Sequence, residues 1–369
     1  MRVLQVSMGE EFGGIEKMEF EIFKNFDKEF EFHFLVPNRN SFGKYVDEIK
    51  KLDGNVYDLG VSRKGFYGRV KYFFRLCKYL KKNKYDVVHI NSSVFMFSFQ
   101  VALISKITGV RKIIVHSHSI PKISLFKKIV KYLLTPIYIR VTDEYLACSN
   151  HSARALFTKG FIEKGKVKII KNGIDIESFK FNESIRNELR GKYELNGKIV
   201  YGHVGRFDKV KNHEFLIDIF YEIQKIQDNS VLLLIGDGEL FEVIKEKVNR
   251  LGISSKVVFL GFNENVNEFL NCMDCFIFPS LSEGFGLSII EAQTNGLTVY
   301  CSNRVNSDDL KVLPSFRLFD LNDRPEEIAE DICKENFDVV NRKDMFKYSI
   351  EYGFDIKDVC GKIKKIYIS

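Results

Sequence analysis

The chain has 369 residues, which is too long for one compact core, and at roughly 150 residues per domain two domains are expected. Hydrophobic residues make up 45% and charged residues 28% of it, a globular composition that excludes a disordered chain or a fibrous repeat. The net charge of +7 is unevenly distributed, because residues 1–180 hold 32 of the 56 basic side chains but 18 of the 49 acidic ones. Such a one-sided charge favours an anionic partner and does not bear on the fold.

Short apolar runs typical of strands alternate along the chain with segments of helical periodicity. Strand-like runs lie at 2–8, 30–37, 86–90, 112–116, 145–149 and 167–170, and then at 198–205, 231–236, 257–261, 275–279 and 297–301. Apolar residues recur with helical spacing between Ile15 and Phe26 and again between Phe215 and Ile226. This alternation predicts parallel sheets that are covered by helices on both faces.

The series of strands pauses over the polar stretch 174–198, and the balance of charge changes sign there. We therefore expect an N-terminal domain of residues 1–180 and a C-terminal domain of residues 181–345. Doubly wound domains bind ligands at the carboxyl ends of their strands, so a reactive cleft is expected between the two.

Nothing in the sequence predicts secretion or a membrane span. The N-terminus enters a strand-like run directly, and the longest apolar stretch, residues 94–105, is about 12 residues long and too short for a bilayer. The seven cysteines are scattered, as in a reducing compartment. Cys272 and Cys275 have the spacing of a metal or redox pair, but they lie in an apolar run without a second pair, which favours simple packing. A cytoplasmic protein is expected.

The most informative segment is 280–299, SLSEGFGLSIIEAQTNGLTV. A strand-like run ends at Pro279, and a glycine-bearing turn leads from Glu283 into a helix over about 287–295. Free backbone N–H groups at a helix start attract phosphate, and glycines let a ligand approach closely. Glu283 and Glu291 can then face one cleft, where carboxylates suit a pair of vicinal hydroxyls. The alternative is a capped helix with two solvated acids.

Three further segments with candidate residues follow strand-like runs. Arg206 comes directly after one run and Lys211 precedes a helix, so the two cations suit a diphosphate held without metal, although surface charge is the alternative. The pair Gly13-Gly14 opens a helix but is not part of a G-x-G-x-x-G, which disfavours a dinucleotide dehydrogenase. His116 and His118 lie at the end of the run 112–116, and at least one of them is expected to be structural.

These segments together resemble the retaining glycosyltransferases of family 4, whose α/β fold, called GT-B, has two Rossmann-like doubly wound domains facing a central cleft. The resemblance follows the family's order from residue 1 to about 300, and VHSHS is most similar to the exopolysaccharide and capsule branch. The matching segments are FGGIE (12–16), IIKNGID (169–175), VGRFDKVKN (204–212), LLLIGDGEL (232–240) and EGFGLSIIEAQTNGLTV (283–299).

The resemblance implies a role for each matching residue. Glu291 would bind the ribose hydroxyls of the nucleotide, and Arg206 and Lys211 would bind the diphosphate. His116 would lie near the donor sugar, with His118 as the second choice; His118 and Asn172 are candidates on the acceptor side. The remaining donor-binding residues would be Gly13, Gly14, Glu283, Gly284, Phe285, Gly286 and Leu287. Two positions depart from the family: Thr298 replaces a common proline, and Asn91 replaces a second histidine.

The implied activity is retaining, metal-independent transfer of a sugar from a nucleotide sugar, expected to be a UDP-sugar, to a lipid-linked or glycan acceptor in bacterial surface polysaccharide synthesis. No cofactor and no metal site are implied, and the sequence contains no Asp-x-Asp triplet. The alternatives are a GT-B sugar-nucleotide epimerase, a soluble-acceptor synthase and a non-catalytic sugar-nucleotide-binding subunit. By analogy with other GT-B chains, residues 346–369 are expected to return to the first domain as a helix.

Residues 61–140 contain 17 basic residues and one acid, Asp86. Within them, 64–84 and 122–132 mix lysine and arginine with large apolar side chains, which is typical of helices that lie on an anionic membrane surface. An ordinary solvated helix surface is the alternative. No nucleic-acid partner is expected, because no helix-turn-helix, RNP, KH or zinc pattern is present. The sequence therefore predicts a peripheral protein on the inner face of the cell membrane.

Overall fold

The computed structural model describes residues 1–7, 13–37, 42–43, 45–61, 65–119, 124–305, 307–337 and 341–369. Contacts divide the chain into two units, of which the first contains Met1–Ile174 together with Asp355–Ser369 and the second contains Asp175–Phe354. The boundaries expected from the sequence, residues 180 and 345, both fall inside the second unit.

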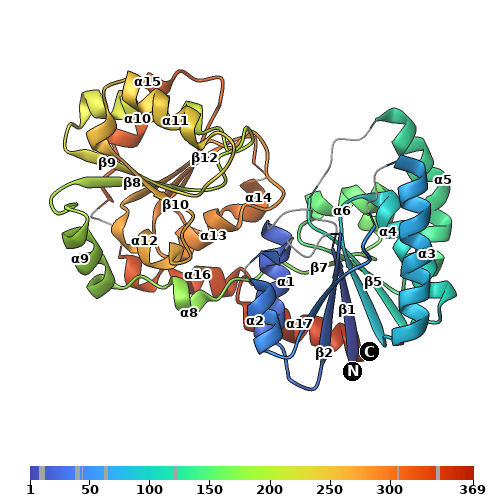
Figure 1. Cartoon of the computed structure of the whole chain (residues 1–369). Coiled ribbons are helices and arrows are strands. Elements are labelled where there is room, and N and C mark those ends of the chain that lie inside the picture. Colours follow the sequence, from blue (N-terminus) through green and yellow to red (C-terminus); the bar gives the residue numbers. More distant parts are fainter. Residues whose placement is uncertain are drawn as a thin grey trace. The chain divides into compact units, whose positions relative to one another are not determined.

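The first unit is a parallel sheet with helices on both faces (Figure 1). Its strand order is β3-β2-β1-β4-β5-β6-β7. The strands are β1 (Arg2–Ser7), β2 (Glu31–Val36), β3 (Asn55–Asp58), β4 (Val87–Asn91), β5 (Lys112–Ser117), β6 (Glu144–Ala147) and β7 (Lys168–Ile169). The helices are α1 (Gly14–Lys24), α2 (Tyr45–Lys51), α3 (Gly65–Asn83), α4 (Phe95–Ile107), α5 (Leu125–Val141), α6 (Asn150–Leu156), α7 (Lys159–Glu163) and α17 (Ile356–Ile368).

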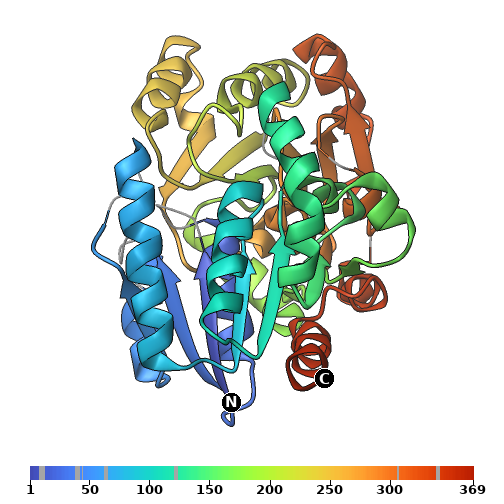
Figure 2. The same cartoon turned by 90° about the vertical axis from the view of Figure 1, so that its right-hand side faces the viewer.

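Alternate side chains of these buried strands feed two separate cores, as the twofold period of a strand requires. Val3 and Val87 point to the face that α1, α2 and α17 cover, whereas Leu4 and Val88 point to the face that α3, α4, α5 and α6 cover. In Figure 2 the helices α3, α4 and α5 lie side by side across the second face. The last helix of the chain, α17, therefore belongs to the first unit.

The second unit repeats the plan with the strand order β10-β9-β8-β11-β12-β13. The strands are β8 (Ile199–Val204), β9 (Ser230–Ile235), β10 (Val257–Gly261), β11 (Cys275–Phe278), β12 (Thr298–Ser302) and β13 (Phe316–Phe319). The helices are α8 (Ile176–Phe179), α9 (Glu183–Lys192), α10 (His213–Ile226), α11 (Phe241–Arg250), α12 (Val266–Cys272), α13 (Leu287–Thr294), α14 (Ser307–Leu310), α15 (Pro325–Cys333) and α16 (Phe346–Glu351). Helices α10, α11 and α15 pack on one face of the sheet.

Two parallel, doubly wound sheets confirm the fold class expected from the sequence. The strands β3 and β13 were not predicted, and both lie at the edge of a sheet. An edge strand has a neighbour on one side only, so its sequence need not be a continuous apolar run; NVYD and FRLF accordingly mix polar and apolar residues.

Candidate functional site

In the second unit, strand order reverses between β8 and β11, and parallel α/β sheets bind ligands at the carboxyl ends of the strands at such a point. The loop after β8 carries Arg206 and Lys211, and the loop after β11 carries Glu283. The two loops are joined by a backbone hydrogen bond from Leu281 N–H to the Val210 carbonyl, 2.8 Å long. The topology therefore brings together residues that are more than 70 positions apart in the chain.

The central contact of this site is an ion pair between Lys211 and Glu283. Lys211 Nζ lies 2.7 Å from Glu283 Oε1, and the two side chains are 18% and 11% exposed. The backbone N–H of Lys211 donates to Asp208 Oδ1 at 3.0 Å, which fixes the loop, and its ammonium lies 4.7 Å from the centre of the Phe278 ring. Arg206, by contrast, is exposed. Lys211 was expected to bind the diphosphate and Glu283 to hold the donor sugar. The sequence did not predict that these two side chains form an ion pair with each other.

Helix α13 begins at the glycine-bearing turn as expected. Gly286 has φ 72°, a left-handed conformation that favours glycine, and it directly precedes Leu287, the first residue of the helix. Phe285 is buried against Phe354, with ring centres 5.8 Å apart, so this residue anchors the turn through its side chain. Glu291 lies in the second turn of α13 and is 2% exposed, which rules out the alternative of a solvated acid at this position.

Glycines also allow the loops behind the site to approach closely. A Cβ added to Gly236 would lie 2.0 Å from the carbonyl oxygen of Gly205, directly before Arg206. Beneath this contact His203 is buried and its Nδ1 lies 2.8 Å from the Ile277 carbonyl oxygen. Burial lowers the pKa of His203 well below its usual range, and the neighbouring His213 adds to the effect. The sequence analysis did not single out these two histidines, which support the loop.

In the first unit, Gly13 and Gly14 open α1 at the carboxyl end of the sheet. Gly13 N–H donates to Glu16 Oε2 at 3.0 Å, and no atom of the described residues lies within 4 Å of a Cβ built on Gly14. Space for a close approach therefore exists at Gly14. The rest of the predicted glycine loop, residues 8–12, lies outside the described residues.

The two candidate histidines of the first unit are buried and lie against each other, with their ring planes tilted by 42°. His116 belongs to β5 and its ring lies between His89, 5.4 Å away, and His118, 4.1 Å away. Neither ring nitrogen of His116 makes a hydrogen bond of normal geometry with a described residue. Burial lowers the pKa of His116 well below its usual range, the adjacent histidines add to this, and the backbone of Ile170 only partly opposes it.

His118 is held by polar groups on both sides of its ring. Its Nε2 lies 3.2 Å from Asn91 Oδ1, and its Nδ1 lies 3.3 Å from Asn172 Oδ1. Burial lowers the pKa of His118 to about 4, so the ring is neutral at pH 7. The structure thus brings together Asn172, His118 and Asn91, the residue that departs from the family pattern.

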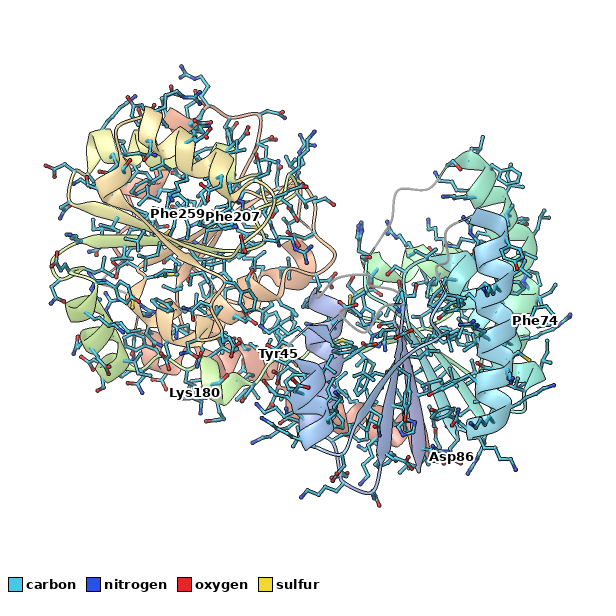
Figure 3. All side chains as sticks on the ribbon, in the orientation of Figure 1. Tyr45, Phe74, Asp86, Lys180, Phe207 and Phe259 are labelled. Carbon is cyan, nitrogen blue, oxygen red and sulfur yellow. The ribbon has the colours of Figure 1, made fainter. Side chains whose placement is uncertain are left out.

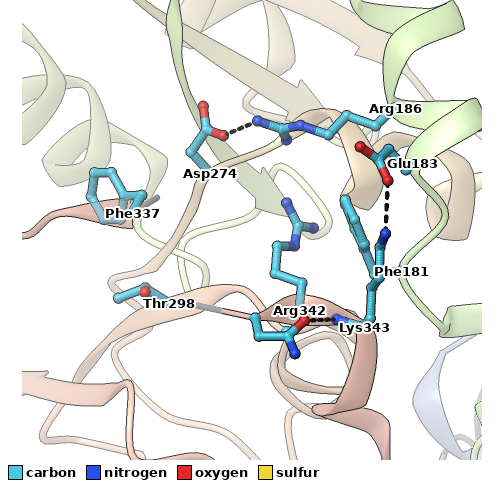
Figure 4. A pocket seen from close by; sticks show the side chains of 10 residues that line it. Phe181, Glu183, Arg186, Asp274, Thr298, Phe337, Arg342 and Lys343 are labelled. Atoms are coloured by element: carbon cyan, nitrogen blue, oxygen red, sulfur yellow. Dashed lines mark hydrogen bonds and ion pairs between the residues drawn. The ribbon is translucent and has the colours of Figure 1, made fainter. Parts of the chain in front are cut away.

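Figure 4 shows a pocket of the second unit whose lining contains neither Lys211 nor Glu283. Its volume is about 230 Å³. It lies at the amino ends of β11 and β12, beside Asp274 and Thr298. Arg186 and Arg342, which line it, already donate to backbone carbonyls at the ends of α12 and α13, such as those of Met273 and Asn295. These cations hold helix ends in place, and we assign no ligand to the pocket.

The thiols of Cys272 and Cys275 are both buried and unpaired, and burial raises the pKa of each. Among the described residues there is no group of three or more histidine, cysteine or acidic side chains arranged to hold a metal ion. Within the same residues, no helix combines the length and apolarity needed to cross a bilayer.

Two doubly wound units, each with polar residues at its switch point, define the class of GT-B glycosyltransferases. The family model "Glycosyltransferase Family 4" matches residues 12–178, and the model "Glycosyl transferases group 1" matches residues 185–331. The chain belongs to glycosyltransferase family 4, and it is therefore a glycosyltransferase. The family expected from the sequence is confirmed.

Relatives match over nearly the whole chain. The UDP-Gal:alpha-D-GlcNAc-diphosphoundecaprenol alpha-1,3-galactosyltransferase of Escherichia coli is 26% identical over 100% of this chain and 97% of its own. The capsular polysaccharide biosynthesis glycosyltransferase CapH of Staphylococcus aureus is 26% identical over 97% of this chain and 96% of its own. The crystal structure of HepE from Anabaena in complex with UDP has a TM-score of 0.78 at 20% identity and covers 99% of both chains, which shows a common fold.

Proposed function

We propose that the protein transfers a sugar from a UDP-sugar to a lipid-linked or glycan acceptor during the synthesis of a bacterial surface polysaccharide. The observation that carries the proposal is the Lys211–Glu283 pair at the switch point of the second unit, with Arg206 and the buried Glu291 on the same two loop–helix segments. The Escherichia coli relative takes UDP-galactose and a diphosphoundecaprenol acceptor by its name, and HepE was also crystallised with UDP-glucose.

In this proposal each group of the second unit has one task. Glu291 accepts hydrogen bonds from the two ribose hydroxyls, and Glu283, with the backbone from Gly284 to Leu287, holds hydroxyls of the donor sugar. Lys211 has three donors and gives one to Glu283, so two remain for the diphosphate, where Arg206 adds a planar fork. In the first unit, Gly13 and Gly14 admit the phosphates or the acceptor, and the histidine pair His116 and His118 serves the donor sugar.

The reaction breaks the bond between the sugar C1 and a diphosphate oxygen, so negative charge builds up on the leaving UDP. Fixed cations aimed at that charge stabilise the transition state, and Arg206 and Lys211 supply them without a metal ion. A same-face substitution with retention of configuration is the proposed route, and it needs no nucleophilic side chain. The acceptor oxygen forms the new bond to C1 as the diphosphate leaves, and the proton of the acceptor hydroxyl passes to an oxygen of the departing diphosphate.

A thermal-shift screen with UDP-, GDP- and ADP-sugars, followed by product analysis with the labelled hit, tests this function. We expect a UDP-sugar to raise the melting temperature, because a ligand that binds only the folded state stabilises it. We then expect labelled sugar on a lipid-diphosphate acceptor in the presence of EDTA. Epimerised nucleotide sugar, or binding without any transfer, would contradict the proposal.

We further propose that the protein is cytoplasmic and binds the inner face of the membrane through α3 and α5. Neither helix contains an acidic residue, and both expose large apolar side chains between lysines and arginines. Phe74 projects outward from α3 and is 76% exposed (Figure 3). The surface, called here the basic apolar face, consists of Tyr67, Arg69, Val70, Lys71, Phe74, Lys78, Lys81 and Lys82 on α3, and Leu125, Phe126, Lys127, Lys128, Ile129, Tyr132, Leu133 and Ile137 on α5.

The basic apolar face differs at two points from the stretch 122–132 that the sequence indicated. Lys131 points inward, where its Nζ donates to the carbonyls of Arg154 and Ala155 at 2.6 and 2.8 Å, and burial lowers its pKa to about 8. The exposed apolar stripe also continues past Tyr132 to Ile137. A helix binds an anionic membrane surface when its apolar side chains enter the headgroup region and its exposed lysines attract the anionic lipids.

Replacing Phe126 and Leu133 together by serine should reduce flotation with phosphatidylglycerol-containing vesicles at least about tenfold, since each buried side chain contributes about 1.5 kcal/mol or more. The double substitution Ile226→Ser and Val243→Ser, at exposed apolar positions of the second unit, is the matched control. Binding should weaken in high salt and on phosphatidylcholine alone. Equal flotation of both variants, or no salt dependence, would show that α3 and α5 do not bind lipid.

A further inference from the structure

A chain of buried polar side chains runs beneath the histidine pair in the first unit. It links β1, β4, the loop after β5, α1 and α17 through Gln5, Asn91, His118, Glu19 and Tyr367. All five side chains are buried. Unpaired polar groups are costly at such depth, so the directions of the hydrogen bonds are strongly constrained.

The amide of Asn91 is the branch point of this chain. Its Nδ2 donates one hydrogen to Gln5 Oε1 at 2.8 Å and the other to Glu19 Oε1 at 2.6 Å. Both amide hydrogens are therefore used, and Oδ1 is the only group of Asn91 that faces His118. An amide oxygen can only accept, so the hydrogen in this contact belongs to Nε2 of His118.

The orientation of Gln5 is fixed from the other side. Gln5 Nε2 donates to the Tyr367 hydroxyl oxygen at 2.9 Å, which leaves Gln5 Oε1 facing Asn91. The hydroxyl hydrogen of Tyr367 then points to Nδ1 of His89, 2.8 Å away. Burial lowers the pKa of His89 to about 3, so the ring is neutral, and Nδ1 accepts in the tautomer that carries its hydrogen on Nε2. Tyr367 in the last turn of α17 thus closes the network.

We propose that Glu19, acting through Asn91, is a positioning residue that holds His118 as the neutral tautomer with hydrogen on Nε2. The inference rests on the proposed function in one respect, namely that His118, as a member of the histidine pair, serves the donor sugar. In this tautomer Nδ1 keeps its lone pair, so the Asn172 amide, whose Oδ1 lies 3.3 Å from Nδ1, has to be turned over for its Nδ2 to donate there. A ring held in one tautomer and one orientation offers the same acceptor in every catalytic cycle.

The opposite tautomer of His118, with hydrogen on Nδ1, requires the side-chain amides of Asn91 and Gln5 to turn over. Asn91 would then direct its oxygen at Glu19 and Gln5, and its Nδ2 would donate to a bare Nε2 of His118. An ionised Glu19 can only accept from Asn91, so it enforces the first arrangement, whereas a protonated carboxyl can also donate to the Asn91 oxygen. Burial, together with the adjacent Glu16, raises the pKa of Glu19 well above its usual range. Removing the acceptor at position 19 releases the constraint.

The test is a long-range ¹H–¹⁵N spectrum of the full-length protein labelled with [¹⁵N]histidine, with the His118 signals identified by their loss in His118→Ala. At pH 7 we expect His118 to be protonated at Nε2 in the wild type and in Glu19→Gln, which retains an acceptor oxygen. In Glu19→Leu, which has a similar size but no acceptor, the form protonated at Nδ1 should appear and kcat should fall about tenfold with the KM for the donor unchanged. Glu48→Leu, at an exposed glutamate of the same unit, is the matched control.

A wild-type signal with hydrogen on Nδ1, or an unchanged tautomer in folded Glu19→Leu, would overturn the proposal. The wild-type spectrum decides the tautomer even if Glu19→Leu does not fold. A protein that shows the Nε2–H form but transfers no sugar from any nucleotide sugar would contradict the proposed function and leave this inference intact.

Discussion

Replacing Lys211 with alanine should reduce sugar transfer by about 10²- to 10³-fold, the loss expected when one preorganised group that stabilises transition-state charge is removed. The substitution also leaves Glu283, which is 11% exposed, without the ammonium that now lies 2.7 Å from its carboxylate. The loss should appear in kcat more than in the KM for the donor, because the leaving diphosphate gains charge in the transition state. Steady-state kinetics with the donor identified by thermal shift measure it.

Two further variants make this result interpretable. Arg206 is exposed, so Arg206→Ala should lower transfer similarly while the melting temperature changes little. Lys209→Ala removes an exposed cation from the same loop and should retain full activity. Unchanged transfer in both Lys211→Ala and Arg206→Ala would exclude the assignment of these cations to the diphosphate.

The second large effect is expected on nucleotide affinity. Glu291→Ala should weaken binding of UDP about 100-fold, since two hydrogen bonds from ribose hydroxyls to a charged acceptor contribute about 3 kcal/mol together. Glu291 is 2% exposed in the second turn of α13, so its position is set by the helix and does not depend on a mobile loop. Isothermal titration with UDP, which lacks the sugar, separates this effect from contacts with the donor sugar.

Glu291→Gln keeps the volume and one acceptor oxygen, and an intermediate loss is expected. Glu188→Ala removes an exposed acid from α9 and should bind UDP as the wild type does. If Glu291→Ala binds UDP with unchanged affinity and remains folded, the ribose must be held elsewhere.

Local sequence was sufficient to predict most strands of both sheets. Runs such as VLLLI and CFIF are buried on both faces in β9 and β11, so their apolar character is continuous and easily recognised. The edge strands β3 and β13 escaped prediction because an edge position tolerates polar residues. The return of a C-terminal helix to the first unit, expected over residues 346–369, came from family analogy. In the structure Asp355–Ser369 belong to that unit, and Ile356, Val359 and Ile363 pack with α1 and the sheet, whereas residues 346–354 belong to the second unit.

The sequence predicted the individual residues of the candidate site, but it did not predict which of their side chains contact each other. Spacing placed Glu283 in a turn and Glu291 in the helix after it, which the structure bears out. The partner of Glu283 is 72 residues earlier, and no local pattern reveals it. Asn91 looked like a departure from the family, yet its amide is the branch point of the network that holds His118.

The sequence by itself determined the family, the two-sheet plan and the chemical types of the residues after β5, β8 and β11, because these depend on periodicity, glycine positions and short-range order. Only the tertiary structure decided which charges pair and which imidazoles remain neutral. Those properties depend on burial and on neighbours from distant segments, such as Tyr367 beside Gln5 and His89, since a pKa or an ion pair is set by the surroundings of a group in space.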